Sequence, residues 1–332
     1  MSDLTRARRA EEAQRAAAAR KRPPLQPGDI DLRVQLDDMI LRNPILTASG
    51  TFASGQEINR FFDVNRLGAV VVKSITLDPR PGLPTPRMAE TASGMLNAIG
   101  LQNPGIERWL QVDYPWLVHH RVPIIASISG STVHEFRVVA EKLRGLDGIV
   151  AIEANISAPN GGDGGVMFAS REGPTHEVVA TIMRVATVPV FAKLSPDVTD
   201  IVSIAHAAAE AGAAGVSLIN TLLGMAIDVE TRRPKLGAGT GGLSGPAIKP
   251  IAIRAVHQIH SVLPDLPIIG MGGARSVEDV IEFMLAGASA VAVGTATFAN
   301  PVATLELVEQ LPVWLAKHGI KRVRALTGGV KL

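Results

Sequence analysis

Short runs of β-branched and small apolar residues recur along the chain, and each run is bounded by Gly, Pro, Ser or Asn. Few polar residues interrupt them, which is typical of parallel strands covered on both faces rather than of strands with one face in water. We therefore expect eight buried strands, at residues 44–49, 69–75, 123–129, 149–157, 189–195, 214–220, 267–273 and 290–296.

Amphipathic patterns of helical period alternate with these strands. One opens on Asp200 as an N-cap and ends at Gly212, and another opens on Ser276, with acidic residues in its first turn, and ends at Gly287. Eight strands that alternate with helices predict an α/β fold, a single (β/α)8 TIM barrel. A doubly wound sheet is the alternative, but eight units without a mid-chain switch favour closure.

Two connections between the expected strands are much longer than the others. They cover residues 76–122 after the second strand and 221–245 after the sixth. Both leave the carboxyl ends of strands, the face on which barrels build their active sites, and long loops there are usually lids or subsites. We therefore expect functional residues on this face.

The two ends of the chain differ from its body. Residues 1–28 form a basic tail without an apolar stripe, broken at Pro23, which we expect to be disordered. The barrel is expected over residues 29–318, and a short C-terminal tail over 319–332.

Composition narrows the class of protein. Of 332 residues 46% are hydrophobic, yet no apolar run is long enough to span a bilayer. The net charge of +2 comes from the N-terminal segment. Residues 1–22 hold seven basic and three acidic residues, whereas the rest of the chain holds 26 basic and 28 acidic residues. A near-neutral body gives no case for nucleic-acid binding. No signal peptide is visible, so we expect a cytoplasmic protein without a membrane partner.

The chain has no cysteine, which excludes disulfides, thiolate metal sites, iron–sulfur clusters held by this chain and a cysteine nucleophile. Its eight histidines are scattered, without partner acids at ligand spacing. No metal site is expected.

Glycines end the last two expected strands, in "GMGG" and "VGTA", each before a helix. At these two places barrels bind a phosphate through backbone N–H groups, and glycine is needed because a Cβ would hold the anion away from the amides. "GMGG" alone is more often only a turn. The two loops together predict a phosphate site.

Lys73 and Lys193 end two apolar strands. Because a charged side chain among apolar neighbours needs an anionic partner, we expect a phosphorylated flavin or an anionic substrate to supply one. A lysine that forms a Schiff base is the competing interpretation.

Uncharged polar residues on the same face would orient a small planar ligand. They are Asn155, Asn160, Asn220 and Thr221.

From Asp31 to about Leu315 the chain resembles the dihydroorotate dehydrogenases, and most closely the catalytic subunit of class 1B. Nine ordered segments carry the resemblance: "NPILTASGTF", "GAVVVKSITLDPRPGLPTPR", "GMLNAIGLQNPG", "NISAPN", "PVFAKLSP", "LINT", "GGLSGPAIKP", "GMGG" and "VGTA". The resemblance implies oxidation of (S)-dihydroorotate to orotate in pyrimidine biosynthesis, with FMN bound on the carboxyl face of the barrel.

Carried over position by position, the resemblance implies two sets of binding residues. The flavin would be held by Ser49, Gly50, Lys73, Ser74, Ser127, Asn155, Lys193, Ile219, Gly245, Gly272, Gly273, Gly294 and Thr295. The substrate would contact Lys73, Asn97, Ala98, Ile99, Gly100, Leu101, Asn155, Asn160, Asn220 and Thr221.

The resemblance also implies partners. Class 1 proteins are at least homodimers, and those of class 1B need a second subunit with FAD and a 2Fe–2S cluster that passes electrons to NAD. The assembly would then be a heterotetramer. The absence of cysteine fits this division, since the cluster would belong to the partner.

Two positions depart from the family. It has Cys, or Ser in class 2, where this chain has Ala158, and usually Asn, contacting the flavin, where this chain has Ser127. In the family reaction the residue at the first position removes a proton from C5 while a hydride leaves C6 for flavin N5. Alanine cannot take a proton, and general-base catalysis is worth about 10²–10⁴ in rate.

Three explanations of Ala158 stay open. A substitute base can act, for which Ser127, bound water and, less favourably, Ser157 are the candidates. The substrate can be another dihydropyrimidine that needs no base there. The cysteine can also have been replaced deliberately, since the whole chain lacks this residue.

Two other classes of function also stay open. A lyase or isomerase barrel would use Lys73 or Lys193 as a Schiff base, which explains the glycines and one lysine but not the asparagines. A flavin-binding electron-transfer subunit without its own substrate would fit Ala158, but not Asn97 and Asn220.

Overall fold

The computed structural model describes residues 24–158 and 167–331. Most of the expected N-terminal tail, residues 1–23, and the expected substrate residue Asn160 lie outside the described residues. No described helix is both long enough and apolar enough to cross a bilayer.

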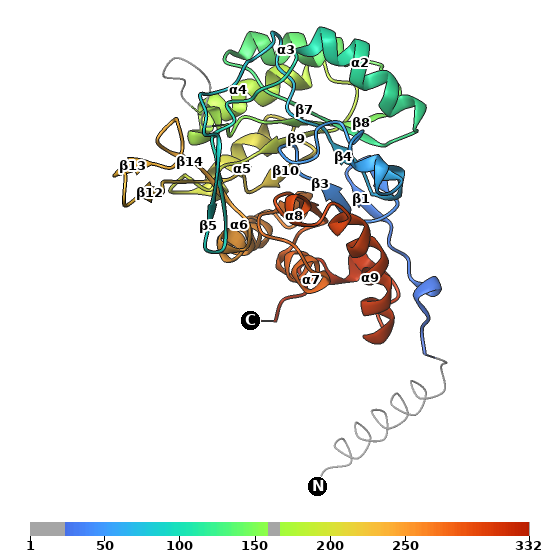
Figure 1. The fold of residues 1–332 in the computed structure, drawn as a ribbon. Helices are drawn as coiled ribbons and strands as arrows, with labels where there is room; N and C mark the ends of the chain where they lie inside the picture. Colours follow the sequence, from blue (N-terminus) through green and yellow to red (C-terminus); the bar gives the residue numbers. More distant parts are fainter. Residues whose placement is uncertain (1–23, 159–166, 332) are drawn as a thin grey trace, which may run out of the picture.

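Eight parallel strands form the central sheet: β3 (Ile45–Thr47), β4 (Val70–Val71), β7 (Ile124–Ile128), β8 (Ile149–Ala154), β9 (Val190–Lys193), β10 (Gly215–Leu218), β15 (Ile268–Met271) and β16 (Ala290–Val293). They pair in the order β3-β16-β15-β10-β9-β8-β7-β4, and a parallel bridge between Leu46 and Ala69 joins the two ends of this order. Each expected run contains one strand, and the closed order confirms the barrel over the doubly wound sheet (Figure 1).

Helices surround the barrel, and most helices that follow one another in the chain also pack against one another (Figure 1). They are α2 (Ile106–His119), α3 (Val133–Lys142), α4 (Glu172–Met183), α5 (Ile201–Glu210), α6 (Lys249–Val262), α7 (Val277–Ala286), α8 (Ala296–Ala299) and α9 (Ala303–Lys317). The two expected N-caps are confirmed. The Asp200 carboxylate accepts from the backbone N–H groups of residues 202 and 203, and Ser276 forms a capping box with Asp279.

The two long connections pair with each other, which the sequence did not predict. β5 (Met88–Thr91) and β6 (Gly94–Asn97) come from the first, and β11 (Leu222–Gly224) and β14 (Gly241–Ser244) from the second. They form one antiparallel sheet in the order β11-β14-β6-β5, here called the wall sheet. A hairpin of β12 (Ile227–Asp228) and β13 (Arg233–Pro234) extends beyond it at the edge of the molecule (Figure 1).

The two terminal segments of the described chain meet at one place on the barrel. An N-terminal hairpin of β1 (Val34–Leu36) and β2 (Met39–Leu41) buries four apolar side chains. Asp31 pairs with Arg322, and after α9 the short helix η6 (Val323–Leu326) buries both of its terminal residues. Other single turns are η1 (Pro27–Asp29), η2 (Ile58–Arg60), η3 (Val64–Arg66), η4 (Phe168–Ser170) and η5 (Pro246–Ile248). The domain limits at residues 28 and 318 stay predictions.

Candidate active site

A cavity of about 360 Å³ lies at the carboxyl ends of the barrel strands, within the usual range for small-molecule sites of roughly 300–1,000 Å³. Residues at or within two positions after the carboxyl ends of seven of the eight strands line it, together with both long connections. Nineteen of the expected site residues lie on it: Ser49, Gly50, Lys73, Ser74, Asn97, Ile99, Gly100, Leu101, Asn155, Ala158, Lys193, Ile219, Asn220, Thr221, Gly245, Gly272, Gly273, Gly294 and Thr295.

Two described residues of the expected set do not line the cavity. Ala98 is buried in a small apolar cluster with Leu96 and Leu236 because it follows Asn97 in the chain and points to the opposite side. Ser127 is fully buried beneath the cavity. Neither position supports direct contact of its side chain with a ligand in the cavity.

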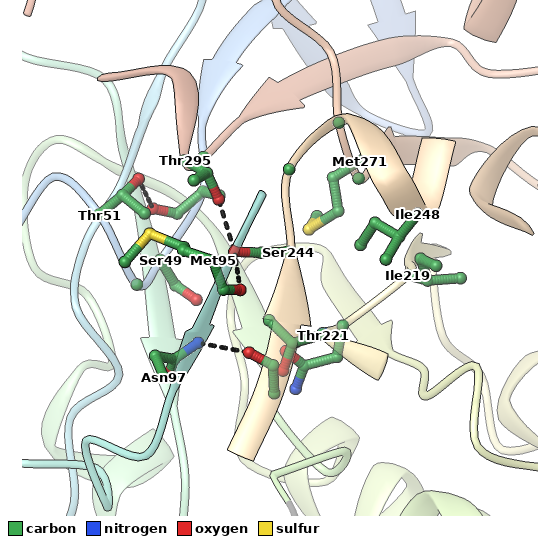
Figure 2. Close-up of a pocket in the computed structure, with 18 of the residues that line it drawn as sticks. Ser49, Thr51, Met95, Asn97, Ile219, Thr221, Ser244, Ile248, Met271 and Thr295 are labelled. Carbon is green, nitrogen blue, oxygen red and sulfur yellow. Dashed lines mark hydrogen bonds between the residues drawn. The ribbon is translucent and has the colours of Figure 1, made fainter. Parts of the chain in front are cut away.

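In the glycine loop after β15, the main chain lies too close to a neighbouring segment to leave room for side chains. Gly273 has a φ of +84°, and a Cβ placed on it would lie 2.7 Å from the carbonyl oxygen of Gly245. In the neighbouring loop after β16, Thr295 Oγ1 donates to Ser244 Oγ at 2.7 Å. This bond connects the loop to the wall sheet (Figure 2). No other described residue accepts a hydrogen bond from the backbone N–H of Gly273 or Thr295. These amides can therefore bind an anion.

Lys193 also lines the cavity and is only 4% exposed. Its ammonium donates to Ser49 Oγ at 3.0 Å and to Glu153 Oε1 at 3.4 Å. The sequence predicts that a ligand supplies the anionic partner of this lysine, but the structure supplies one from the chain itself, the Glu153 carboxylate. The signal for Glu153 was present, as the one acidic residue in the apolar run 149–157.

The Glu153 carboxylate is 1% exposed and accepts three side-chain hydrogen bonds. Besides Lys193, Ser127 Oγ donates to Oε1 at 3.0 Å and Ser217 Oγ donates to Oε2 at 3.0 Å. A buried carboxylate is tolerated when it is paired and hydrogen-bonded in this way. We call the group Ser49, Ser74, Ser127, Glu153, Asn155, Lys193 and Ser217 the floor network.

Asn155 belongs to the same network through Ser74 and Ser127. Its Nδ2 donates to Ser74 Oγ at 2.9 Å, and Ser74 Oγ lies 2.9 Å from Ser127 Oγ. Ser127 Oγ gives its single hydrogen to Glu153, so it can only accept from Ser74, and the Ser74 hydroxyl is therefore the donor between the two serines. Ser127 thus contacts Ser74 and Glu153 and lies away from the cavity. This arrangement argues against Ser127 as a base in contact with substrate.

The loop after β8 places Ala158 on the cavity wall. Its neighbour Ser157 is buried, donates to Asn155 Oδ1 at 3.3 Å and accepts from Asn220 Nδ2 at 3.0 Å. Asn220 Oδ1 in turn accepts from the backbone N–H of Thr221 at 2.8 Å. The hydrogen of Ser157 is therefore engaged, and the side chain of residue 158 is only a methyl group.

Lys73 differs from Lys193, although both line the cavity. Burial lowers the pKa of Lys73, and the positive charge of Lys193 lowers it further. Unlike Lys193, Lys73 forms no ion pair with another described residue. It is a half-buried amine whose positive charge, when it is protonated, an anionic ligand can neutralise.

The wall sheet completes the cavity. Asn97 of β6 donates from Nδ2 to the carbonyl oxygen of Gly242 on β14 at 3.2 Å, and Thr221 lies beside this contact (Figure 2). The sequence did not predict the remaining cavity residues, which are Ala48, Thr51, Met88, Met95, Gly242, Ser244, Pro246, Ile248, Met271, Ala274, Arg275, Ala296, Phe298 and Ala299. Among the described residues, no group of three His, Asp or Glu side chains could hold a metal ion.

Known proteins resemble this chain over most of its length. The family model described as dihydroorotate dehydrogenase matches residues 31–315. The dihydroorotate dehydrogenase B (NAD(+)) catalytic subunit of Listeria welshimeri is 50% identical over 295 residues, which cover 89% of this chain and 97% of that protein. The subunit of the same name from Halalkalibacterium halodurans is 50% identical over 298 residues, with 90% and 97% covered.

A solved structure shows the same fold. The crystal structure of DHODH from Eimeria tenella in complex with ferulenol superimposes with a TM-score of 0.75 and covers 96% of this chain and 94% of its own. Its sequence is only 21% identical, so this likeness concerns the fold alone.

Proposed function

Because the chain belongs to the dihydroorotate dehydrogenase family, whose members are oxidoreductases acting on CH–CH groups, we propose that it oxidises (S)-dihydroorotate to orotate with FMN as cofactor. The observation that carries the proposal is the division between two lysines in one cavity. Lys193 is neutralised by Glu153, whereas Lys73 has no acidic partner among the described residues. One cation can therefore take the substrate carboxylate while the other holds the cofactor.

The residues present fit FMN. The unbonded amides of Gly273 and Thr295 suit its phosphate, and a Cβ at Gly273 would collide with the chain around the loop. Lys193, Asn155 and Ser74 offer polar atoms to the ring from the floor of the cavity. When bound, FMN supplies the acceptor for the hydride that leaves C6 of the substrate.

The substrate would lie between the floor network and the wall sheet. The Lys73 ammonium would bind its carboxylate. Asn97, Asn220 and Thr221 would bind the amide groups of the ring, since their side chains carry both donors and acceptors. Because these side chains are uncharged, they would orient the ring and leave the substrate carboxylate to Lys73.

The proton from C5 has no acceptor at position 158. Ser127 is beneath the cavity, and Ser157 already donates to Asn155. We propose that water beside Ala158 takes this proton. Since water is a weak base, the reaction would be slow compared with a protein that carries a thiol there.

The relatives are named catalytic subunits, which supports a separate partner subunit. We propose that the partner carries FAD and a 2Fe–2S cluster and passes the electrons to NAD. A homodimer of this chain with two such partners would form a heterotetramer. The cytoplasmic location stays a prediction.

A Schiff-base lyase is the second candidate. The lowered pKa of Lys73 favours it, because a deprotonated lysine is a nucleophile. Treatment with a carbonyl substrate and borohydride would leave a mass adduct on Lys73 in a lyase and none in a dehydrogenase.

The test is anaerobic mixing of the FMN-loaded protein with dihydroorotate, followed by stopped-flow absorbance of the flavin. Dihydrouracil, which has the same ring without the carboxylate, is the matched control. We expect bleaching with dihydroorotate alone. Bleaching with dihydrouracil alone would assign another dihydropyrimidine, and a protein that takes up no FMN would overturn the flavin assignment.

A further inference from the structure

Glu153 is a buried ionisable group that the proposed reaction does not use. It is 1% exposed, and it does not line the cavity. Burial of a carboxylate costs free energy even when it is paired, and apolar residues of similar volume are often as stable. A role in holding the strands together does not by itself require a charge at this position.

The partners of Glu153 come from successive strands of the barrel. Ser127 is on β7, Glu153 on β8, Lys193 on β9 and Ser217 on β10. Ser127 lies opposite Glu153 in the strand register, and Ser217 lies opposite Lys193. One carboxylate therefore receives hydrogen bonds from both neighbouring strands, β7 and β9, and from β10, the strand beyond β9.

Only one of these partners reaches the cavity. Lys193 lines it, whereas Ser127 and Ser217 do not. Its ammonium has three N–H donors, of which Ser49 and Glu153 accept two, at 3.0 and 3.4 Å. The third remains for a ligand, and its direction is set by the other two bonds.

We propose that Glu153 is a positioning residue for the cofactor: it aims the Lys193 ammonium at the flavin ring and balances its charge, and so sets the reduction potential of bound FMN. This inference rests on the proposed function, because FMN itself is proposed. Together Glu153 and Lys193 carry no net charge. Without the carboxylate the pair would carry one positive charge, which favours the reduced ring because that ring holds more negative charge.

The test is the midpoint potential of FMN bound to the full-length protein, measured by equilibration with a reference dye. Glu153→Gln keeps the shape and one acceptor oxygen but removes the charge. We expect the ratio of reduced to oxidised flavin at a given potential to rise about tenfold, which is about 30 mV for a two-electron couple. Lys193→Gln should shift the potential in the opposite direction. Ser217→Ala, which removes one hydrogen bond but no charge, should shift it much less.

The double variant Glu153→Gln/Lys193→Gln keeps the test valid if the single Glu153 variant does not fold, because it leaves no buried charge unpaired. Its potential should exceed that of Lys193→Gln by a similar tenfold ratio. Equal potentials in that comparison, or a folded Glu153→Gln protein with the parent potential, would overturn the inference. A parent protein that takes up no FMN would overturn the proposed function, and the flavin role of Glu153 with it.

Discussion

The floor network and the wall sheet enclose the same cavity but are built in opposite ways. In the floor, Glu153 alone accepts three side-chain hydrogen bonds from buried partners. In the wall sheet, Asn97 makes one, to a main-chain oxygen, and Met88 and Leu223 are 46% and 55% exposed. The floor suits a cofactor that stays bound, because its groups are already oriented. The wall suits a substrate that must enter and leave.

We expect the largest effect on the reaction rate from a substitution at Ala158, which lines the cavity but carries no group that can accept a proton. Ala158→Cys should raise the rate of flavin reduction by dihydroorotate by about 10²–10⁴ and leave FMN affinity unchanged. Ala158→Val, of similar size but without a proton acceptor, is the matched control. Stopped-flow reduction measures both. Equal rates in parent and Cys variant would show that another group of the cavity already serves as the base.

The glycine loop tests whether the phosphate end belongs to the cofactor. In Gly273→Ala the new Cβ would lie 2.7 Å from a main-chain oxygen, so the loop must move, and we expect FMN affinity to fall at least about tenfold. Gly239→Ala is the control, since its φ of +81° imposes the same backbone strain where no atom lies within 4 Å of the Cβ. Fluorescence titration of the apoprotein with FMN measures the affinity. A similar loss in both variants would indicate strain alone.

Lys73 tests the division between the two lysines. Lys73→Met should raise KM for dihydroorotate about 10- to 100-fold, since it removes a charge-assisted bond. The effect depends on pH with a definite sign. The pKa of Lys73 is below the 10.5 of an ordinary lysine, so the ammonium loses its proton, and the parent loses affinity, as pH rises through that lowered value.

The pH profile of orotate binding, followed by the flavin spectrum, checks this sign. Affinity in the parent should fall on the alkaline side, and affinity in Lys73→Met should be low and independent of pH over the same range. The exposed Lys317 on α9 provides the control, since Lys317→Met should reproduce the parent profile. A parent profile that also stays flat would remove Lys73 from the substrate site.

The same contrast explains what could be predicted from the sequence. The barrel strands are buried on both faces, so their apolar runs mark them without any knowledge of their neighbours. β6 and β14 read "GMLN" and "GGLS", with no β-branched residue, and they are strands because they pair across about 145 positions of the chain. Local propensity could not reveal that pairing.

The floor network was predicted only in part for a related reason. The sequence placed Ser74, Asn155 and Lys193 at strand ends, where the fold class alone puts them in the site. Whether Glu153 and Ser127 face the cavity or each other depends on the stagger between β7 and β8, in which these two residues lie opposite one another. That stagger is a property of the closed barrel and not of either strand.

Asn97 gives the smallest expected effect and the closest test of the comparison. Asn97→Ala removes one hydrogen bond of 3.2 Å between β6 and β14 and one polar group from the cavity. The loss of such a group costs about 1 kcal/mol, so KM for dihydroorotate should rise about fivefold. FMN affinity should not change if the floor holds the cofactor, as the proposed function requires. Ser74→Ala is the counterpart in the floor and should weaken FMN more than substrate, since Ser74 holds Asn155. If Asn97→Ala weakened FMN as much as substrate, the wall would share in holding the cofactor, and the division of labour between the two regions would fail.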